Sequence, residues 1–386
     1  MRARILVTDA QERSMLAVVR CLHDAGHEVT ATASTRLAPG LWSRACATRR
    51  ILPGPSVSVD GFVTRIQALA RAGRSDLLLP GTDAALYAVS LHRIRLAPYV
   101  RLGLPDHEVV EAALDKTALA RYAAAVGFAV PDSSVRESAE GCIEAARAFG
   151  FPVLVKPVRT VDLSQDKLVR HSSRLARDQA AVRDLQRQLG RCIVQRRESG
   201  SVLSFAGVAT EQGLLAAVVS RYRRTWPPEG GNACFSETVT VPGPVAQRVE
   251  ALVSAIGWRG LFELELIEHA DGSLGVIDFN PRAYGSLSLA RAAGVPLPSI
   301  WCGWLLGERS AVRHPPRVGA RYRWEDADLR YAAWELRHAG IRRAAGVIAP
   351  RAGVTHAYFR RSDPAPLAAR SLQLVRAAAR SSADPT

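Results

Sequence analysis

The sequence predicts an α/β domain followed by an α+β region, for three reasons. Strand and helix patterns alternate over residues 1–105, as in parallel sheets covered by helices. Helix, strand, helix and strand patterns follow over residues 106–198, and strand patterns dominate residues 199–306. We therefore expect an N-terminal Rossmann-like domain, a small α+β lid, a strand-rich subdomain and a helical or mixed C-terminal extension over residues 307–386.

The N-terminal domain is expected to contain three strands and two helices. Their order is strand 4–8, helix 11–25, strand 27–31, helix 59–72 and strand 76–80. A dinucleotide site requires a glycine-rich turn after the first strand, but the turn in this sequence reads Asp9-Ala-Gln-Glu-Arg13. The domain is thus predicted to be Rossmann-like without the dinucleotide fingerprint.

Elements of the lid and of the following parts are read in the same way. A helical pattern from Asp106 to about Val126 includes Asp115-Lys116-Thr117, inside it or at a break. Further elements are expected as helices 139–149 and 175–189, strands ending at Lys156 and Gln195, and strands 201–210, 214–222, 238–241, 260–268 and 275–280. The extension ends in a polar tail, Ser381 to Thr386, which we expect to be disordered.

The charge of the chain does not point to a nucleic-acid-binding protein. The formal net charge is +15, but only three of the 51 basic residues are lysines, the arginines are spread along the chain, and aromatic residues make up 6%. Backbone binding to nucleic acids favours clustered basic residues, often with aromatic side chains for stacking. An anionic small molecule therefore fits the charge better than a polymer does.

The cysteines and the N-terminal segment indicate the compartment. Six cysteines are scattered without a C-x-x-C pair or a zinc-ligand spacing. Such residues are expected to be small buried hydrophobic side chains in a reducing environment. Asp9 interrupts the N-terminal apolar run, and no later run reaches the length of a membrane span. We expect a cytoplasmic protein that does not contact membranes.

Two of the three lysines stand in contexts that suggest phosphate binding. Lys116 lies within Asp115-Lys116-Thr117 at a helical pattern, and Lys156 ends the apolar strand Phe151 to Pro157. Lysine is a compact point charge that enters a nucleotide pocket more easily than the planar arginine fork. Plain alternatives exist: Asp115 as a helix N-cap and Lys156 as a solvated strand end. Lys167 lies in a polar stretch and is expected to be solvated.

A hairpin in the strand-rich subdomain gathers acidic residues. Residues 262–280 form two alternating strand patterns around Asp271-Gly272, a favoured two-residue turn. If those two residues are the loop, Glu265 faces Asp278 and Glu263 faces Asn280. Because strand side chains alternate, these four lie on one face. The other face is then covered by Phe262, Leu264, Leu266, Ile277 and Phe279.

This acidic face is a candidate Mg²⁺ site. Three carboxylates and an amide repel one another unless a cation lies between them, and hard oxygen ligands suit Mg²⁺ completed by substrate phosphates. The alternative is a solvated outer face of a half-buried hairpin. Asn280-Pro281-Arg282 favours the functional interpretation, because Arg282 at the strand end would lie beside metal-bound phosphates.

Taken in chain order, these motifs resemble the ATP-grasp superfamily of ligases. The motifs are Asp115-Lys116, Val153-Leu-Val-Lys156-Pro157, Ile193-Val-Gln195, Glu265, and Asp278-Phe-Asn280-Pro-Arg282. The resemblance extends over roughly the first 305 residues and includes the preceding α/β domain. It implies the ATP-grasp fold and the cofactors ATP and Mg²⁺, with Mn²⁺ as a substitute.

The resemblance also implies a role for each matching residue. Lys116 and Lys156 would contact ATP phosphates, and the segment from Gln195 to Glu198 would hold adenine and ribose. Mg²⁺ would be bound by Glu265, Asp278 and Asn280. Lys156 and Arg282 would be the catalytic residues, with Arg282 steadying the transferred phosphate. Glu263 aligns less well with the first acidic ligand of the family.

Two departures from the family pattern concern the nucleotide site. Arg196-Arg197 separate Gln195 from Glu198, where relatives usually carry an acidic residue directly after the glutamine. The segment 158–165 contains no glycine, although many relatives have a flexible glycine-rich loop there that covers the phosphates. The adenine and ribose contacts are therefore open at this point.

The resemblance implies an ADP-forming ligase. A carboxylate would be activated as an acylphosphate and attacked by an amine or a thiol, and phosphoryl transfer would rely on positioning and charge neutralisation by Lys116, Lys156, Arg282 and Mg²⁺. Two alternatives remain: a regulatory protein that binds Mg-ATP without turnover, and an Arg-rich nucleic-acid-binding protein. The sequence identifies neither the acid and amine substrates nor the oligomeric state.

Overall fold

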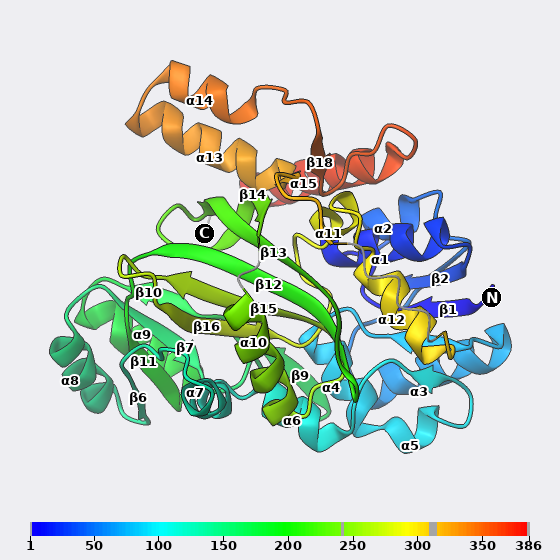
Figure 1. The fold of residues 1–386 in the computed structure, drawn as a ribbon, viewed down its shortest axis with the longest axis horizontal. Coiled ribbons are helices and arrows are strands. Elements are labelled where there is room, and N and C mark those ends of the chain that lie inside the picture. Colours follow the sequence, from blue (N-terminus) through cyan, green and yellow to red (C-terminus); the bar gives the residue numbers. More distant parts are fainter. Residues whose placement is uncertain (1, 241–242, 309–314, 384–386) are drawn as a thin grey trace.

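The computed structural model of the chain describes residues 2–240, 243–308 and 315–383. In Figure 1 a strongly curved central sheet lies between the N-terminal domain and the lid, and the C-terminal extension crosses above the sheet. The predicted fold class is confirmed, with an α/β N-terminal domain, an α+β lid and a mixed extension.

The N-terminal domain is a parallel sheet in the order β3-β2-β1-β4-β5, with helices on both faces. Ile5 and Val7 of β1 pack with α1, whereas Leu6 packs with α3 and α4. The elements are β1 (Arg4–Val7), α1 (Arg13–Asp24), β2 (Glu28–Ala33), α2 (Pro39–Trp42), β3 (Thr48–Ile51), α3 (Val59–Gly73), β4 (Leu77–Leu79), α4 (Asp83–Leu91), α5 (Arg93–Leu96) and β5 (Arg101–Leu102). The Rossmann-like topology matches the prediction.

The lid is an antiparallel sheet in the order β10-β7-β11-β6, covered by α8 and α9. Its elements are β6 (Ser133–Arg136), α8 (Ala139–Phe149), β7 (Val153–Pro157), β10 (Arg174–Ala176), α9 (Gln179–Leu189) and β11 (Cys192–Arg196). The helix predicted over 175–189 begins later, because residues 174–176 pair with β7 and the Asp178 carboxylate accepts the amide of Ala181 at 2.8 Å as an N-cap.

Two helices connect the N-terminal domain with the lid. They are α6 (His107–Leu114) and α7 (Lys116–Ala125), separated at Asp115. The Asp115 carboxylate accepts the backbone amides of Thr117 and Ala118 at 2.7 and 3.0 Å, so it is the N-cap of α7. The helical pattern is therefore broken at this residue, and the break places Lys116 in the first turn of α7.

The central sheet has seven strands in the order β16-β15-β12-β13-β14-β17-β18. Its elements and the helices around it are β12 (Ser201–Thr210), β13 (Gly213–Trp226), β14 (Asn232–Val239), α10 (Gly243–Ile256), β15 (Gly260–Glu268), β16 (Leu274–Asn280), α11 (Ser288–Ala292) and α12 (Leu297–Leu305). Helix α10 was not predicted. The strand expected over 238–241 is the end of β14, and residue 241 lies outside the described residues.

The C-terminal extension adds two strands to this sheet and three helices around it. Its elements are β17 (Arg321–Arg323), α13 (Glu325–His338), α14 (Ile341–Ile348), β18 (Val354–His356) and α15 (Ala365–Ala383). Figure 1 shows α13 and α14 projecting as a helical hairpin beside the sheet. The prediction of a disordered tail from Ser381 is wrong for residues 381–383, which continue α15, and residues 384–386 lie outside the described part.

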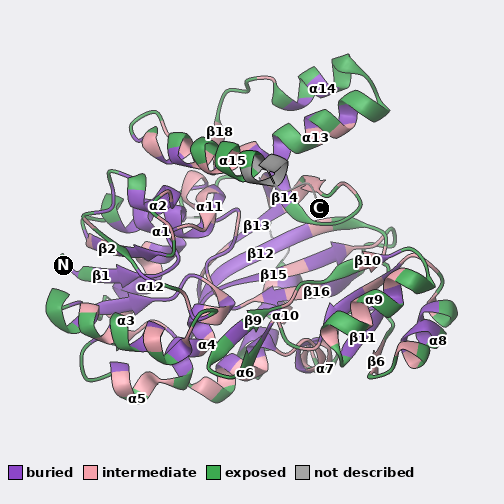
Figure 2. Cartoon of the chain, turned by 180° about the vertical axis from the view of Figure 1, so that it is seen from behind, coloured by how far each residue is buried: buried purple, intermediate pink, exposed green. Residues whose placement is uncertain are grey.

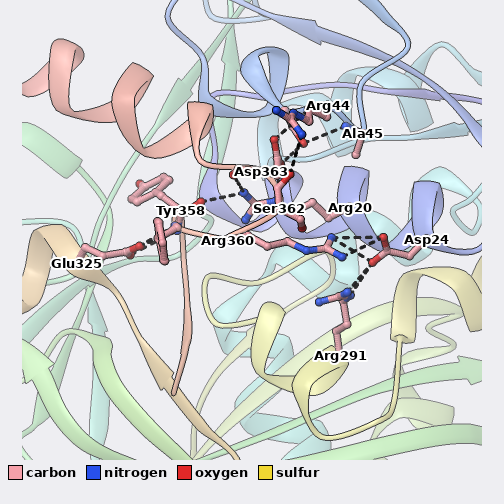
Figure 3. A network of polar contacts seen from close by, with 12 residues as sticks. Arg20, Asp24, Arg44, Ala45, Arg291, Glu325, Tyr358, Arg360, Ser362 and Asp363 are labelled. Atoms are coloured by element: carbon pink, nitrogen blue, oxygen red, sulfur yellow. Dashed lines mark hydrogen bonds and ion pairs between the residues drawn. The ribbon is translucent and has the colours of Figure 1, made fainter. Parts of the chain in front are cut away.

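Buried polar contacts join the extension to the N-terminal domain (Figure 3). Arg20 of α1 donates to the Asp363 carboxylate at 2.9 Å, and the hydroxyl of Ser43 and the amide of Arg44 donate to the same carboxylate at 2.6 and 3.0 Å. Arg20 and Asp363 are both buried. The two ends of the described chain are therefore fixed to each other beside the central sheet.

The burial pattern follows this architecture. Figure 2 shows the strands of the N-terminal and central sheets largely buried, whereas the outer faces of α8, α9, α13 and α14 are exposed. Within residues 2–240, 243–308 and 315–383, no helix is long and apolar enough to cross a membrane.

Candidate active site

The hairpin of β15 and β16 carries the predicted acidic cluster. Glu265 lies opposite Asp278, and Glu263 lies opposite Asn280, as predicted. Opposed residues of an antiparallel pair point to one face, so these four side chains share a face of the sheet. On the other face, four of the predicted side chains are buried in the core: Phe262, Leu264, Leu266 and Phe279.

The predicted turn of this hairpin is wrong, although the pairs at the site are right. The chain reverses over His269 to Ser273, where the amide of His269 donates to the carbonyl of Ser273 at 3.0 Å. The register then shifts by one residue at a β-bulge, which leaves Ile277 without a partner on β15. The longer turn and the bulge offset each other, so the predicted pairs result from two cancelling deviations.

The bulge also creates a contact for Lys156. The Lys156 ammonium group donates to the carbonyl of Ile277 at 3.2 Å, a carbonyl that the disrupted ladder leaves available. Ile277 itself lines a pocket rather than the apolar core, which corrects its predicted place on the apolar face. A single irregular residue thus connects the lid strand β7 with the acidic hairpin.

The carboxylates on the hairpin are crowded; Glu263 is buried, and Glu265 and Asp278 are half-buried. Tyr222 of β13 donates to Glu265 at 2.8 Å and lies 3.2 Å from Glu263, which also accepts the Ser204 hydroxyl at 2.6 Å. Burial, followed by the charges of Glu263 and Asp278, raises the pKa of Glu265 to about 8. Burial also raises the pKa of Glu263. The site therefore holds more negative charge than the folded chain neutralises.

Lys116 supplies part of the missing positive charge. Its position at the start of α7 places the ammonium group against the Asp278 carboxylate, and the two form an ion pair. Burial alone would raise the pKa of Asp278, but the positive charges of Lys116 and Lys156 hold this pKa below its ordinary value. Asp115 is thus the N-cap considered above, and the helix that it caps places Lys116 beside Asp278.

Lys156 is buried and has little compensation for its charge. Burial, reinforced by the neighbouring positive charge of Lys116, lowers its pKa to about 8. Among the described residues no carboxylate lies within ion-pair distance of its ammonium group. The solvated strand end considered for Lys156 is therefore wrong, since only 5% of this residue is exposed.

A pocket of about 210 Å³ opens beside these two lysines, between the lid and the hairpin. Gln195 and Ile193 of β11 contribute to its wall, so Gln195 lies in the same pocket as Lys116 and Lys156. The full lining is Lys116, Thr117, Leu119, Ala120, Val130, Ser133, Val135, Lys156, Ile193, Gln195, Val276 and Ile277. Its wall is mainly apolar with two positive charges at one side, which suits a flat ring attached to phosphates.

Glu198 is not brought to this pocket. It follows the end of β11, and its carboxylate lies 3.8 Å from a ring nitrogen of His269 in the hairpin turn. Arg196 points to Asp132 at 3.1 Å and Arg197 donates to the carbonyl of Glu229 at 3.0 Å. The two inserted arginines therefore lie on the lid surface, and Glu198 lies beyond them.

Arg282 connects the hairpin to the N-terminal domain. Its guanidinium forms two hydrogen bonds to Asp83 of α4, at 2.6 and 3.2 Å, and approaches the Asn280 side-chain oxygen at 3.5 Å. Burial would lower the pKa of Arg282, but the Asp83 carboxylate outweighs this and raises it. Asp83 was missed in the sequence, where it stands at the start of an unpredicted helix.

Comparisons with known sequences agree on the fold. A family model described as "ATP-grasp in the biosynthetic pathway with Ter operon" matches residues 193–327. The carbamoyl phosphate synthase large chain of Gemmatimonas aurantiaca is 26% identical over 216 residues, which cover 53% of this chain and 19% of that protein. The chain thus spans about a fifth of the length of this curated relative.

Solved structures give the same result. Biotin carboxylase from Campylobacter jejuni, in a β,γ-ATP complex, superimposes with a TM-score of 0.64 at 13% identity, over 83% of this chain and 74% of that chain. An L-amino acid ligase from Bacillus licheniformis gives a TM-score of 0.60 at 14% identity, over 81% and 78%. The chain has the ATP-grasp fold, and its residues 193–327 match an ATP-grasp family model.

One segment of this ATP-grasp fold forms a bridge between the lid and the N-terminal domain. The glycine-free segment after Lys156 is a two-stranded hairpin of β8 (Val161–Ser164) and β9 (Lys167–Arg170). At its tip Asp166 accepts the Ser58 hydroxyl at 2.7 Å and the amide of Asp60 at 3.0 Å, at the start of α3. The side chains of Val161 and Leu168 are buried in the core of that domain.

Sequence reasoning missed three residues that support this candidate site. They are Tyr222 and Ser204, which hold the hairpin carboxylates, and Asp83, which holds Arg282. Tyr222 and Ser204 lie in strands that were predicted within a few residues, so their alternation restricts which side chains share a face. The pairing of β12 with both β13 and β15, which brings them to the hairpin, is not encoded in that alternation.

Proposed function

We propose that this chain is an ATP-dependent, ADP-forming ligase that activates a carboxylate as an acylphosphate for attack by an amine or a thiol. The observation that carries the proposal is the buried Lys156 beside a pocket and beside carboxylates that lack a neutralising cation. Mg-ATP supplies the charges that both sides lack, because its phosphates match the lysines and its metal matches the carboxylates.

The donor set suits Mg²⁺ bound together with phosphates. No group of three His, Cys, Asp or Glu side chains in the described part of the chain is arranged to hold a metal ion alone. Mg²⁺ typically uses one or two protein carboxylates and completes its shell with phosphate and water oxygens. We propose Glu265, Asp278 and Asn280 as its protein ligands, with Mn²⁺ as a substitute. When bound, the metal neutralises phosphate charge.

Residues of the chain would bind the nucleotide and stabilise the transferred phosphoryl group. In this proposal Lys116 and Lys156 bind ATP phosphates, and Gln195 with the apolar pocket wall holds the adenine. Glu198 lies beside His269, away from the pocket, so we do not assign it a contact with the ribose. Arg282, oriented by Asp83, faces the transferred phosphoryl group from the N-terminal side. Positioning and charge stabilisation suffice for phosphoryl transfer, and the attacking amine loses its proton to solvent or to the substrate.

The division of the chain also has a proposed functional meaning. The N-terminal part (1–105), the lid part (106–198) and the hairpin part (199–306) meet at Lys116, Lys156, Asp278 and Arg282. The acid and amine would then reach the site between the N-terminal domain and the hairpin. We propose small molecules as substrates, and leave their identity to screening.

The first test is calorimetric titration of ATP with Mg²⁺ or with EDTA. Wild type should bind ATP more tightly with Mg²⁺, and Lys156→Ala and Asp278→Ala should each weaken this binding at least about 100-fold, because each removes a desolvated charge contact. Asp271→Ala is the matched control: it removes an exposed carboxylate from the turn of the same hairpin and should bind like wild type.

Turnover separates the ligase from the two alternatives. Release of ADP and phosphate with a particular acid and amine supports the proposal, whereas release of AMP and pyrophosphate contradicts the acylphosphate route. A protein that binds Mg-ATP but turns over with no acid and amine would be the regulatory protein. Binding to RNA or DNA that weakens steeply with salt and is unaffected by Asp278→Ala would favour the nucleic-acid alternative.

A further inference from the structure

Glu263 is the buried acidic residue of the hairpin that the proposed function leaves without a role. It is 4% exposed. Its carboxylate accepts hydrogen bonds from the Ser204 hydroxyl at 2.6 Å on one oxygen and from the side-chain amide of Asn280 at 3.1 Å on the other, and the oxygen of Tyr222, which donates its proton to Glu265, lies 3.2 Å away. Each of its two oxygens therefore has its own donor within the chain, whereas Glu265 accepts from Tyr222. Glu263 is thus already satisfied by the protein.

The bond from Asn280 fixes which way its amide group points. The nitrogen donates to Glu263 at 3.1 Å, so the oxygen lies on the opposite side, where the Arg282 guanidinium approaches it at 3.5 Å. A carboxylate only accepts and a guanidinium only donates, so both neighbours favour the same orientation. The amide oxygen ligates a cation, whereas the amide nitrogen does not.

We propose that Glu263 is a positioning residue that holds the Asn280 amide with its oxygen directed to the cation. The proposal rests on the proposed function, because it presumes that Asn280 is a metal ligand. Glu263 then acts through Asn280 and touches neither the nucleotide nor the metal. Ser204 contributes by donating to the Glu263 oxygen that does not face Asn280.

The variant Glu263→Gln tests the orientation. The Ser204 hydroxyl donates to the Glu263 oxygen that faces away from Asn280, so the carbonyl of the new glutamine should take that place and its amide nitrogen should face Asn280. Asn280 is then expected to turn its own nitrogen to the cation. The gain in ATP affinity that Mg²⁺ provides should fall at least about tenfold, as for other residues that orient metal ligands.

The double variant Glu263→Gln/Asn280→Asp exchanges the two groups and keeps the net charge. The glutamine nitrogen donates to one oxygen of the new carboxylate, and the other oxygen faces the cation whichever way the group turns. We expect the Mg²⁺-dependent gain to return most of the way to the wild-type value. A role of Glu263 in packing or in total charge does not predict this recovery.

Glu268→Gln is the matched control. It removes a carboxylate from the same strand, where Glu268 pairs with Arg221 at 2.5 Å beyond the bulge, and should leave the Mg²⁺-dependent gain unchanged. All variants are titrated calorimetrically with ATP in Mg²⁺ and in EDTA.

The outcomes distinguish the two proposals. If wild type gains no ATP affinity from Mg²⁺, the proposed function and this inference both fail. If wild type gains affinity and Glu263→Gln gains as much, only the inference fails. If Glu263→Gln does not fold, the double variant decides: recovered Mg²⁺ dependence supports the inference, and a double variant that is unfolded or independent of Mg²⁺ overturns it.

Discussion

Two clusters of charged side chains in this molecule differ in how completely their charges are paired with partners from the chain itself. In the cluster that anchors the extension, the Asp363 carboxylate accepts from Arg20, Ser43 and the amide of Arg44 at 2.6–3.0 Å. In the hairpin cluster, Glu265 accepts from Tyr222, and among the described residues no ion pair includes Glu265 or Lys156.

The pKa values express this difference. Burial would raise the pKa of Asp363, but its three donors hold it below the ordinary value. Burial and neighbouring carboxylates instead raise the pKa of Glu265 to about 8. A cluster whose charges are paired within the chain stabilises the fold. A cluster with unpaired charge has an unfavourable electrostatic free energy in the folded chain, which a ligand of opposite charge can lower by binding. The comparison separates a structural ion pair from a candidate binding site by the electrostatics of the chain alone.

Breaking the matched cluster should have the largest effect on stability. Asp363→Ala leaves the Arg20 guanidinium buried without its partner, which typically costs about 3–5 kcal/mol of unfolding free energy. Urea denaturation measures this loss. Mg-ATP affinity of the folded variant should stay near wild type, because Asp363 does not contact the site. An unchanged unfolding free energy would contradict the contrast drawn between the clusters.

Neutralising the unmatched cluster should stabilise the apoprotein in a pH-dependent way. The pKa of Glu265 is raised from 4.5 to about 8, so between these values the folded chain keeps a proton that the unfolded chain has released. The preference of the folded chain for the protonated Glu265 carboxyl therefore contributes fully to the unfolding free energy of wild type below pH 4.5. This contribution is lost as the pH rises to about 8, by about 1.4 kcal/mol per pH unit, until the folded chain has to hold an ionised and unpaired Glu265. Glu265→Gln should lack this contribution and be more stable than wild type near pH 8.

The measurement is the unfolding free energy of both proteins, without nucleotide or metal, from pH 5 to 8. Glu268→Gln serves as the control, since it removes an equivalent carboxylate from β15 that is paired with Arg221. Parallel curves for wild type and Glu265→Gln across this range would remove the basis for calling the hairpin charges unmatched.

The smallest effect is expected at the exposed ion pairs beside the contacts between the extension and the N-terminal domain. Asp24 forms ion pairs with Arg291 and Arg360, at 2.6 and 3.3 Å, and all three side chains are about one-third exposed. Such pairs are screened by water and contribute about 0–1 kcal/mol. Asp24→Asn should lower the unfolding free energy by no more than this, with the decrease vanishing in high salt. If Asp24→Asn lost as much unfolding free energy as Asp363→Ala, the exposed and the buried ion pairs would contribute equally to stability, which contradicts this prediction.

Local pattern accounts for much of what the sequence predicted about the hairpin. Alternation assigned Glu263, Glu265, Asp278 and Asn280 to one face because side chains in a strand have a period of two. The turn was predicted wrongly, and Ile277 was assigned to the wrong side, because a bulge changes that period at one residue. Neither the added loop residue nor the bulge has a sequence signal as strong as Asp271-Gly272.

The scarcity of lysine located both cationic residues of the pocket. In a chain that otherwise uses arginine, Lys116 and Lys156 stand out by type, and both line the pocket. Glu198 was included because the family resemblance implies that the segment from Gln195 to Glu198 holds adenine and ribose, and the path of the chain beyond β11 takes it to His269. Spacing in a loop is a weaker guide than spacing in a strand, since a loop has no fixed period.

The sequence by itself predicted the order of most strands and of the helices of the lid, the acidic face of the hairpin, and the residue types proposed to bind phosphate and metal. These properties depend on neighbours along the chain, which local periodicity and side-chain chemistry govern. Only the tertiary structure decided that Lys116 meets Asp278, that Arg282 meets Asp83, and that Asn280 is held by Glu263. Those contacts join separate elements, and the burial and electrostatics that set their pKa values exist only once the elements pack together.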